Sequence, residues 1–234
     1  MNEDYLSCDD SRCVLMVEDL AGHTSESEQS AKFNKVIADI VRVYPDALLV
    51  GAVAAAKYIR HPGEPRDTLD VDVLLAEKDF AEFLVDEIPE DKLSRLETYF
   101  ETSDSLNHSM RHRETGIYVD FLSAESQPIR KNLVRRILEN RSQATHTLQN
   151  QGADIEILKP EYLLAMKAMR YSKYFDTERG ASDRQDIVKL LETMEDRNVP
   201  VDHEFVRSLL NRPEKGYYEK ILAERKQAKT RNPA

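Results

Sequence analysis

The fold is decided by residues 69–75, which are Leu69-Asp70-Val71-Asp72-Val73-Leu74-Leu75. Apolar and acidic residues alternate in this segment before it becomes fully apolar. Because successive side chains of a β-strand point to opposite faces, the pattern predicts a strand with one buried face. The two aspartates then share the other face at a separation of about 5–7 Å. Like charges at that distance repel each other unless a cation lies between them.

Two interpretations of this Asp-x-Asp pair are open, an exposed strand face and a metal site. A third carboxylate bears on the choice, because Asp120 lies in an apolar frame within a second predicted strand, residues 116–122. That strand is expected to pair with residues 105–112 as a hairpin around residues 113–115. Three carboxylates that meet at strand ends offer the hard oxygen ligands that Mg²⁺ prefers, and Mn²⁺ shares that preference.

The surrounding pattern predicts an α/β (α+β) arrangement as far as residue 158. A helix is expected from Gln29 to Tyr44, ending before Pro45. Strands are expected at 47–50, 69–75, 145–148 and 155–158, and further helices at 52–59, 78–87 and 128–138. After Pro160 the sequence is helical, with segments at 161–175, 183–196, 203–210 and 214–228. The pattern thus predicts an α/β half followed by an all-helical half, with the junction near Lys159-Pro160.

This pattern divides the 234-residue chain into an acidic extension (1–28), an α/β domain (29–158) and a helical domain (159–234). Hydrophobic residues make up 41% and charged residues 32%, as in an ordinary globular protein. No apolar run approaches the roughly 20 residues that cross a bilayer. The N-terminal residues are acidic and contain no basic region that leads into an apolar stretch, so a secretory signal is not expected. A cytoplasmic location without a membrane partner is therefore expected.

Charge and cysteine content exclude some further classes. The net charge of -10 argues against a protein that wraps nucleic acid by charge alone. The imbalance is concentrated in residues 1–30, which contain eight acids and one base. The two cysteines, Cys8 and Cys13, lie in the same leader and are expected to be free thiols, since no histidine pair accompanies them.

Three motifs in a fixed order carry a family resemblance. They are Val50-Gly51-Ala52, Arg66-x-Thr68-x-Asp70-x-Asp72 and Val119-Asp120-Phe121-Leu122. Together they resemble the DNA polymerase β-like nucleotidyltransferase superfamily, in which a Gly-Ser or Gly-Gly turn opens a helix and a later single Asp joins an Asp-x-Asp strand. The AbiEii-like group, the toxins of type IV toxin–antitoxin systems, is the most similar, because an Arg-x-Thr or Arg-x-Ser precedes its acidic pair. Residues 157–167 and 182–187 are similar to the following segments of that group, so the resemblance spans about residues 33–192.

The resemblance implies a nucleotidyltransferase fold, in which helices flank a short mixed β-sheet and a C-terminal helical bundle follows. It also implies Mg²⁺-dependent transfer of a nucleoside monophosphate from a nucleoside triphosphate. The acceptor would be a hydroxyl group on a tRNA or other RNA end, or on a protein. A cognate antitoxin would be a further partner. The alternative is a catalytically degenerate relative that binds a nucleotide or a partner protein. A phosphohydrolase is disfavoured, because the histidine–aspartate pairing that such enzymes use is not evident.

The resemblance also assigns roles to residues. Asp70 and Asp72 would bind two metal ions, and Asp120 would bind the one that lowers the pKa of the acceptor hydroxyl. The nucleotide would be held by Gly51, Ala52, Arg66, Thr68 and Lys167, with Lys173, Asp183 and Asp186 as further candidates. Ala52 departs from the family pattern, since a serine there would hold a phosphate oxygen. Backbone N–H groups at the helix start can still do so.

Other clusters have simpler interpretations. His108 and His112 are expected to be a surface pair on a strand, because no third metal ligand is nearby. Asp183 and Asp186 are expected at the start of a helix, where acids favour the helix dipole. An aromatic group (Tyr171, Tyr174 and Phe175) is expected in the core, although it could stack a base. A basic group (Arg130, Lys131, Arg135, Arg136 and Arg141) is expected to be a solvated helix face, although it could meet an acidic acceptor.

Overall fold

The structure is a computed structural model that describes residues 28–58, 70–84, 88–102, 108–127, 130–150 and 153–231. The chain forms two compact units. The first comprises Met1–Ser123 with Arg141–Leu158, and the second comprises Ala124–Asn140 with Lys159–Ala234. Residues 124–140 therefore belong to the helical unit, although the sequence pattern had grouped them with the α/β domain.

The first unit is built on one mixed β-sheet of seven strands from the described residues, in the order β3-β4-β5-β2-β1-β7-β6. The pairs β2–β5 and β1–β7 are parallel, and the other neighbours are antiparallel. Apolar side chains of the central strands are buried, as the alternation predicts. The strands are β1 (Leu48–Val50), β2 (Asp70–Leu74), β3 (Phe100–Thr102), β4 (Ser109–His112), β5 (Tyr118–Leu122), β6 (Thr145–Asn150) and β7 (Ala153–Leu158).

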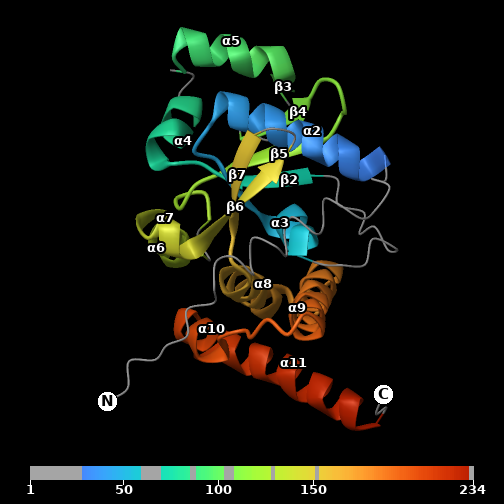
Figure 1. Cartoon of the computed structure of the whole chain (residues 1–234). Coiled ribbons are helices and arrows are strands. Elements are labelled where there is room, and N and C mark those ends of the chain that lie inside the picture. Colours follow the sequence, from blue (N-terminus) through green and yellow to red (C-terminus); the bar gives the residue numbers. More distant parts are fainter. Residues whose placement is uncertain are drawn as a thin grey trace. The chain divides into compact units, whose positions relative to one another are not determined.

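Helices pack on this sheet and join its strands. Helix α2 (Glu28–Val43) runs across the strands and contacts β6, β7 and α5 (Figure 1). Its residues Val36, Ile37 and Ile40 are fully buried, because their helical spacing places them on one face. Helix α3 (Gly51–Tyr58) follows β1 without a loop and packs on β1 and β2. The other helices of this unit are α4 (Glu77–Leu84), α5 (Glu90–Tyr99) and α7 (Arg141–Ala144).

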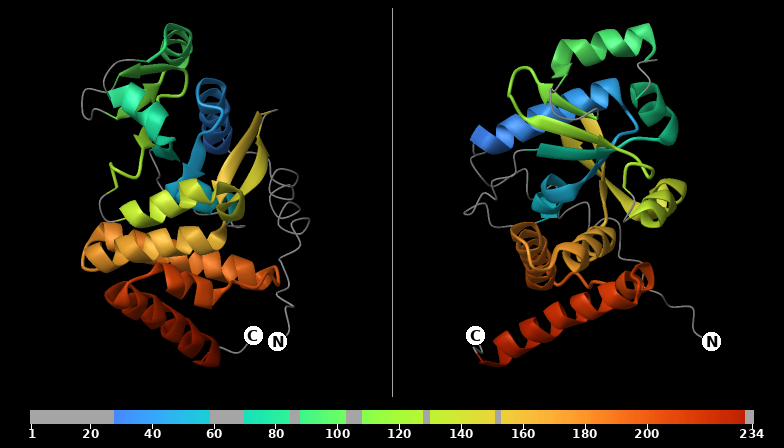
Figure 2. Two further views of the ribbon diagram at one scale, coloured as in Figure 1. Left: turned by 90° about the vertical axis from the view of Figure 1, so that its left-hand side faces the viewer. Right: turned by 180° about the vertical axis from the view of Figure 1, so that it is seen from behind.

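The second unit is helical and is centred on α8 (Pro160–Tyr174). Helix α8 contacts α9 (Glu178–Asp196), α10 (His203–Leu209) and α11 (Arg212–Arg231), and α11 is the long C-terminal helix in Figure 2. Every residue from Tyr162 to Met169 is buried, which is the pattern of a helix surrounded by others. Helix α6 (Lys131–Glu139) completes the unit.

The fold class predicted from the sequence is confirmed, with each predicted strand and helix of the described residues present to within a few positions. Three elements were not predicted, α5, α7 and β3. Helix α9 begins at Glu178 rather than at Asp183, because Thr177 caps it by accepting a hydrogen bond from the Gly180 N–H. Among the described helices, none combines the length and the apolar character that a membrane span requires.

Candidate metal centre

The site is a row of side chains across the centre of the sheet. In the pairing register, Val50 of β1 lies opposite Asp72 of β2, and Asp72 lies opposite Asp120 of β5. Ser109 of β4 lies opposite Asp120 on its other side. Side chains of directly paired residues point to the same face of a sheet, so two carboxylates and a hydroxyl stand next to one another. Asp70 lies two residues before Asp72 and therefore shares that face.

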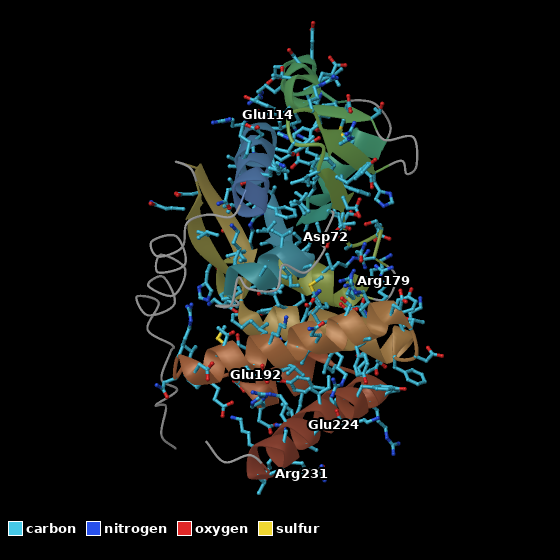
Figure 3. The ribbon with its side chains drawn as sticks, turned by 90° about the vertical axis from the view of Figure 1, so that its right-hand side faces the viewer. Asp72, Glu114, Arg179, Glu192, Glu224 and Arg231 are labelled. Carbon is cyan, nitrogen blue, oxygen red and sulfur yellow. The ribbon has the colours of Figure 1, made fainter. Side chains whose placement is uncertain are left out.

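The three aspartates expected from the sequence converge. Asp70, Asp72 and Asp120 each offer a carboxylate oxygen, and these oxygens all lie within 4.8 Å of one another. All three side chains are half-buried, whereas Val71 and Val73 on the other face are fully buried. Figure 3 shows the labelled Asp72 on β2.

This donor set fits a hard divalent cation. Oxygens bound to one Mg²⁺ at about 2.1 Å stand roughly 3–4 Å apart, so the observed spacing closes by shifts of about an ångström. Two metal ions about 3.5–4 Å apart, bridged by shared carboxylates, fit the same spacing. Three acidic residues at this point of the fold could hold a metal ion, with one chain segment supplying two ligands and another the third.

The turn into α3 is shaped around Asp72. Gly51 has a φ of +71°, a left-handed conformation that side chains other than glycine rarely adopt. A Cβ at Gly51 would lie only 1.9 Å from Oδ2 of Asp72 and 2.7 Å from its Cγ. The sequence therefore needs glycine here for two reasons, the backbone conformation and the close approach of a site carboxylate. Ala52 follows as the second residue of α3, half-buried.

Ser109 belongs to the site and was not predicted from the sequence. Its Oγ donates a hydrogen bond to Oδ1 of Asp120, and the residue is only 6% exposed. The predicted hairpin already paired this segment with the strand of Asp120, and the register of that pairing determines which residue lies opposite Asp120. The register could not be derived, because the connection between the strands is longer than predicted. Arg113, Glu114 and Thr115 form a turn, and Gly116 and Ile117 also lie outside both strands.

The predicted residues of the helical unit form a separate ion-pair network. The Lys167 Nζ lies 2.6 Å from Asp186 Oδ2 and 3.3 Å from Asp183 Oδ1. Arg170 donates two hydrogen bonds to Asp183, at 2.6 Å from Nε and 2.5 Å from Nη2. Lys167, Asp183 and Asp186 are all buried. The expectation that the two aspartates lie at a helix start is wrong. Helix α9 begins at Glu178, so both lie beyond its first turn, and both are buried and bind cations of α8.

The charge state of Asp183 follows from these contacts. Burial alone would raise the pKa of this carboxyl group. The hydrogen bond from Arg170 and the positive charge of Lys167 act in the opposite direction and together lower the pKa below its usual range. Asp183 is therefore held as a carboxylate inside the helical unit.

Three further nucleotide-binding candidates have different outcomes. Arg66 and Thr68 lie outside the described residues. Lys173 is exposed on α8, and its Nζ stands 5.2 Å from the centroid of the Tyr174 ring. Nothing in its surroundings distinguishes it from an ordinary surface lysine.

The expected surface pair of histidines is wrong for His112, which is 1% exposed. Its Nε2 lies 3.1 Å from Oδ2 of Asp39, and its Nδ1 accepts a hydrogen bond from the Thr115 backbone N–H. The Nδ1 atom also lies 2.9 Å from the Thr115 Oγ1, so both ring nitrogens of His112 have polar partners inside the protein. The pair joins α2 to β4. No sequence pattern indicates this pair, because Asp39 lies on a helix far from His112 in the chain.

The Asp39 carboxylate is supported by cations as well. Burial would raise its pKa, but hydrogen bonds from Lys35, His112 and Arg42 lower it overall. Lys35 and Arg42 lie on the same helix, one turn before and one turn after Asp39. This cluster stabilises the packing of α2 on the sheet.

The remaining groups from the sequence analysis are mostly engaged. Arg130 donates to Gln127, Lys131 and Arg135 pair with Glu125, and Arg141 pairs with Glu156. In the aromatic group, Tyr171 is buried as expected and meets Tyr217 edge to face. Phe175 differs, because 54% of it is exposed.

Comparison with known proteins identifies a solved structure with a similar fold. No protein-family model matches the chain, and no curated protein matches it. A solved structure of an antigenic nucleotidyltransferase-like protein from Paracoccidioides brasiliensis is similar, with a TM-score of 0.55 and 17% sequence identity. The match covers 87% of this chain and 90% of that one. At this identity the likeness establishes a shared nucleotidyltransferase-like fold.

Proposed function

We propose that this protein is a Mg²⁺-dependent nucleotidyltransferase that moves a nucleoside monophosphate from a nucleoside triphosphate to a hydroxyl of a macromolecular acceptor. One observation carries the proposal, the convergence of Asp70, Asp72 and Asp120 within 4.8 Å on one face of the sheet. The nucleotidyltransferase-like fold of the similar solved structure supports it. Mn²⁺ is an alternative metal, because it accepts the same oxygen ligands.

The residues of the row have distinct roles in this proposal. Asp70 and Asp72 would hold both metal ions, and Asp120 would hold one. When bound, the metal lowers the pKa of the acceptor hydroxyl and offsets charge on the reacting phosphate. The carboxylates thereby orient the triphosphate relative to the acceptor.

The start of α3 supplies the second part of the site. Gly51 keeps the space beside Asp72 open, and backbone N–H groups of the first helical turn face outward from a helix N-terminus, where phosphate is favoured. Ala52 brings no hydroxyl to this turn, so the triphosphate is held here by the backbone alone. Arg66 and Thr68 are proposed to contact phosphate from the segment before β2. Lys167 would bind phosphate only by giving up its ion pairs with Asp183 and Asp186.

The finer assignment follows the Arg-x-Thr that precedes the acidic pair. On this basis we propose an AbiEii-like protein, with an RNA end or a protein as acceptor and with a cognate antitoxin as partner. A second function is favoured by Ala52, namely a degenerate relative that binds a nucleotide without transferring it, because this residue lacks the phosphate-binding hydroxyl of the family turn.

Labelling experiments test the proposal. Purified protein is incubated with Mg²⁺, each of the four α-³²P-labelled nucleoside triphosphates, and either total tRNA or total protein. We expect label in one acceptor class, abolished by Asp70→Ala and unchanged by Asp46→Ala, a matched control in the exposed turn before β1. Nucleotide binding without any labelling would favour the degenerate relative. Labelling that survives Asp70→Ala would contradict the proposed site.

A further inference from the structure

We propose that Ser109 is a positioning residue that fixes the orientation of the Asp120 carboxylate as a metal ligand. This inference rests on the proposed function, because it concerns the same row of side chains. Ser109 Oγ donates to Oδ1 of Asp120, and the serine is 6% exposed. The hydroxyl is thus directed to the carboxylate and largely shielded from water.

The sheet itself places the two groups together. Ser109 and Asp120 are directly paired in the antiparallel β4–β5 ladder, and the Phe121 N–H donates to the His108 carbonyl at 2.9 Å beside them. Paired residues of neighbouring strands have Cβ atoms about 4.5–5.5 Å apart. A serine hydroxyl spans that distance to a carboxylate without any distortion of the backbone.

Asp120 needs such support because of its other neighbour. On the β2 side it lies opposite Asp72, another carboxylate. Two carboxylates side by side repel each other. The final torsion of an aspartate is soft, since rotation about the Cβ–Cγ bond has no sharp staggered minima. The plane of the Asp120 carboxylate is therefore set by its hydrogen bonds, and the hydroxyl of Ser109 supplies one on the side away from Asp72.

The hydrogen bond leaves the carboxylate able to bind a cation. An ionised carboxylate has about four lone-pair sites, and Ser109 occupies one of them. Groups that orient a metal ligand typically contribute about 10- to 100-fold to metal affinity or activity. In the proposed function Asp120 contacts only one of two metal ions. Loss of the hydroxyl should then weaken that ion selectively and leave triphosphate binding through Asp70 and Asp72 in place.

Mn²⁺ binding to the full chain tests this role, with free Mn²⁺ followed by electron paramagnetic resonance. We expect Ser109→Ala to weaken binding by about 10-fold or more. Ser109→Thr retains the hydroxyl and should remain within about threefold of the wild type. Ser208→Ala is the matched control, because that hydroxyl donates to the Phe205 carbonyl of its own helix, in the helical unit rather than the sheet. Affinity for a non-hydrolysable triphosphate should change less than about twofold in Ser109→Ala.

The outcomes separate the two proposals. Equal Mn²⁺ affinity in the wild type and Asp70→Ala would overturn the metal site, and both proposals with it. Weaker binding in Asp70→Ala and Asp120→Ala but not in Ser109→Ala would overturn the role of Ser109 alone. Equal losses in Ser109→Ala and Ser109→Thr, with thermal stability unchanged, would assign the effect to packing and also overturn the role of the hydroxyl.

Discussion

Two groups of aspartates in this protein differ in what surrounds them. Asp183 and Asp186 of the helical unit are buried against Lys167 and Arg170, at distances of 2.5–3.3 Å. Asp70, Asp72 and Asp120 of the sheet are half-buried against one another. Among the described residues, no cationic side chain forms an ion pair with Asp70 or Asp120, and Asp120 accepts a hydrogen bond from the neutral hydroxyl of Ser109.

The difference separates a structural use of carboxylates from a functional one. A buried carboxylate that is matched by cations from its own chain stabilises one arrangement of helices, and it offers little to a ligand. Carboxylates gathered on one face repel one another in the folded protein, so their arrangement costs stability. Such a cost is typical of sites where an external cation completes the structure.

The largest effect is expected from a substitution that breaks the ion-pair network of the helical unit. Asp183→Ala leaves the guanidinium of Arg170 and the ammonium of Lys167 with less negative charge nearby, and breaking a buried pair in this way costs about 3–5 kcal/mol. Asp70→Ala should cost no stability in EDTA, because it relieves repulsion within the aspartate triad, which is Asp70, Asp72 and Asp120. Chemical denaturation of both variants measures the contrast. A loss in Asp70→Ala as large as that in Asp183→Ala would remove the distinction between the groups.

Acid should produce a smaller loss from the same network. The pKa of Asp183 is lowered in the folded state, because Arg170 and Lys167 outweigh the effect of burial. The stabilisation is therefore complete above the unfolded-state pKa, about 4, and is lost as the pH falls through the lower folded-state value. The stability difference between wild type and Asp183→Asn should be constant from pH 7 to 5 and should narrow below pH 4. If the stability difference widened in acid, the pKa of Asp183 would be raised in the folded state rather than lowered.

Sequence patterns predicted much of the sheet site, and particular residues show why. The alternation in residues 69–75 predicted β2 and its acidic face, because a strand has a fixed period of two. The motif order added Asp120 and Gly51. The parallel register that places Asp120 beside Asp72 could not be derived, since it joins strands distant in the chain.

The missed features depend on tertiary contacts or on weak patterns. Helix α5 was not predicted because Leu96 is its buried residue, and one buried position gives no helical stripe. The buried pair of His112 with Asp39 joins a strand to a helix from another part of the sequence. Lys167 was interpreted as a phosphate ligand because a helical lysine carries no mark of its partner. Its pairing with Asp186 appears only when α8 and α9 are packed.

The smallest effect is expected when a divalent cation binds the aspartate triad. A cation that binds only the folded protein stabilises it by RT ln(1 + [L]/Kd), about 1.4 kcal/mol at ten times the Kd. Mg²⁺ should therefore raise the melting temperature of the wild type, and Mn²⁺ should do the same. Asp120→Ala should reduce this increase in melting temperature, and Asp70→Ala should abolish it. Asp183→Asn should instead lower the melting temperature measured without the cation and leave the increase intact. Equal rises in all four proteins would mean that Mg²⁺ acts elsewhere, and the triad would then be a strained face without a cation.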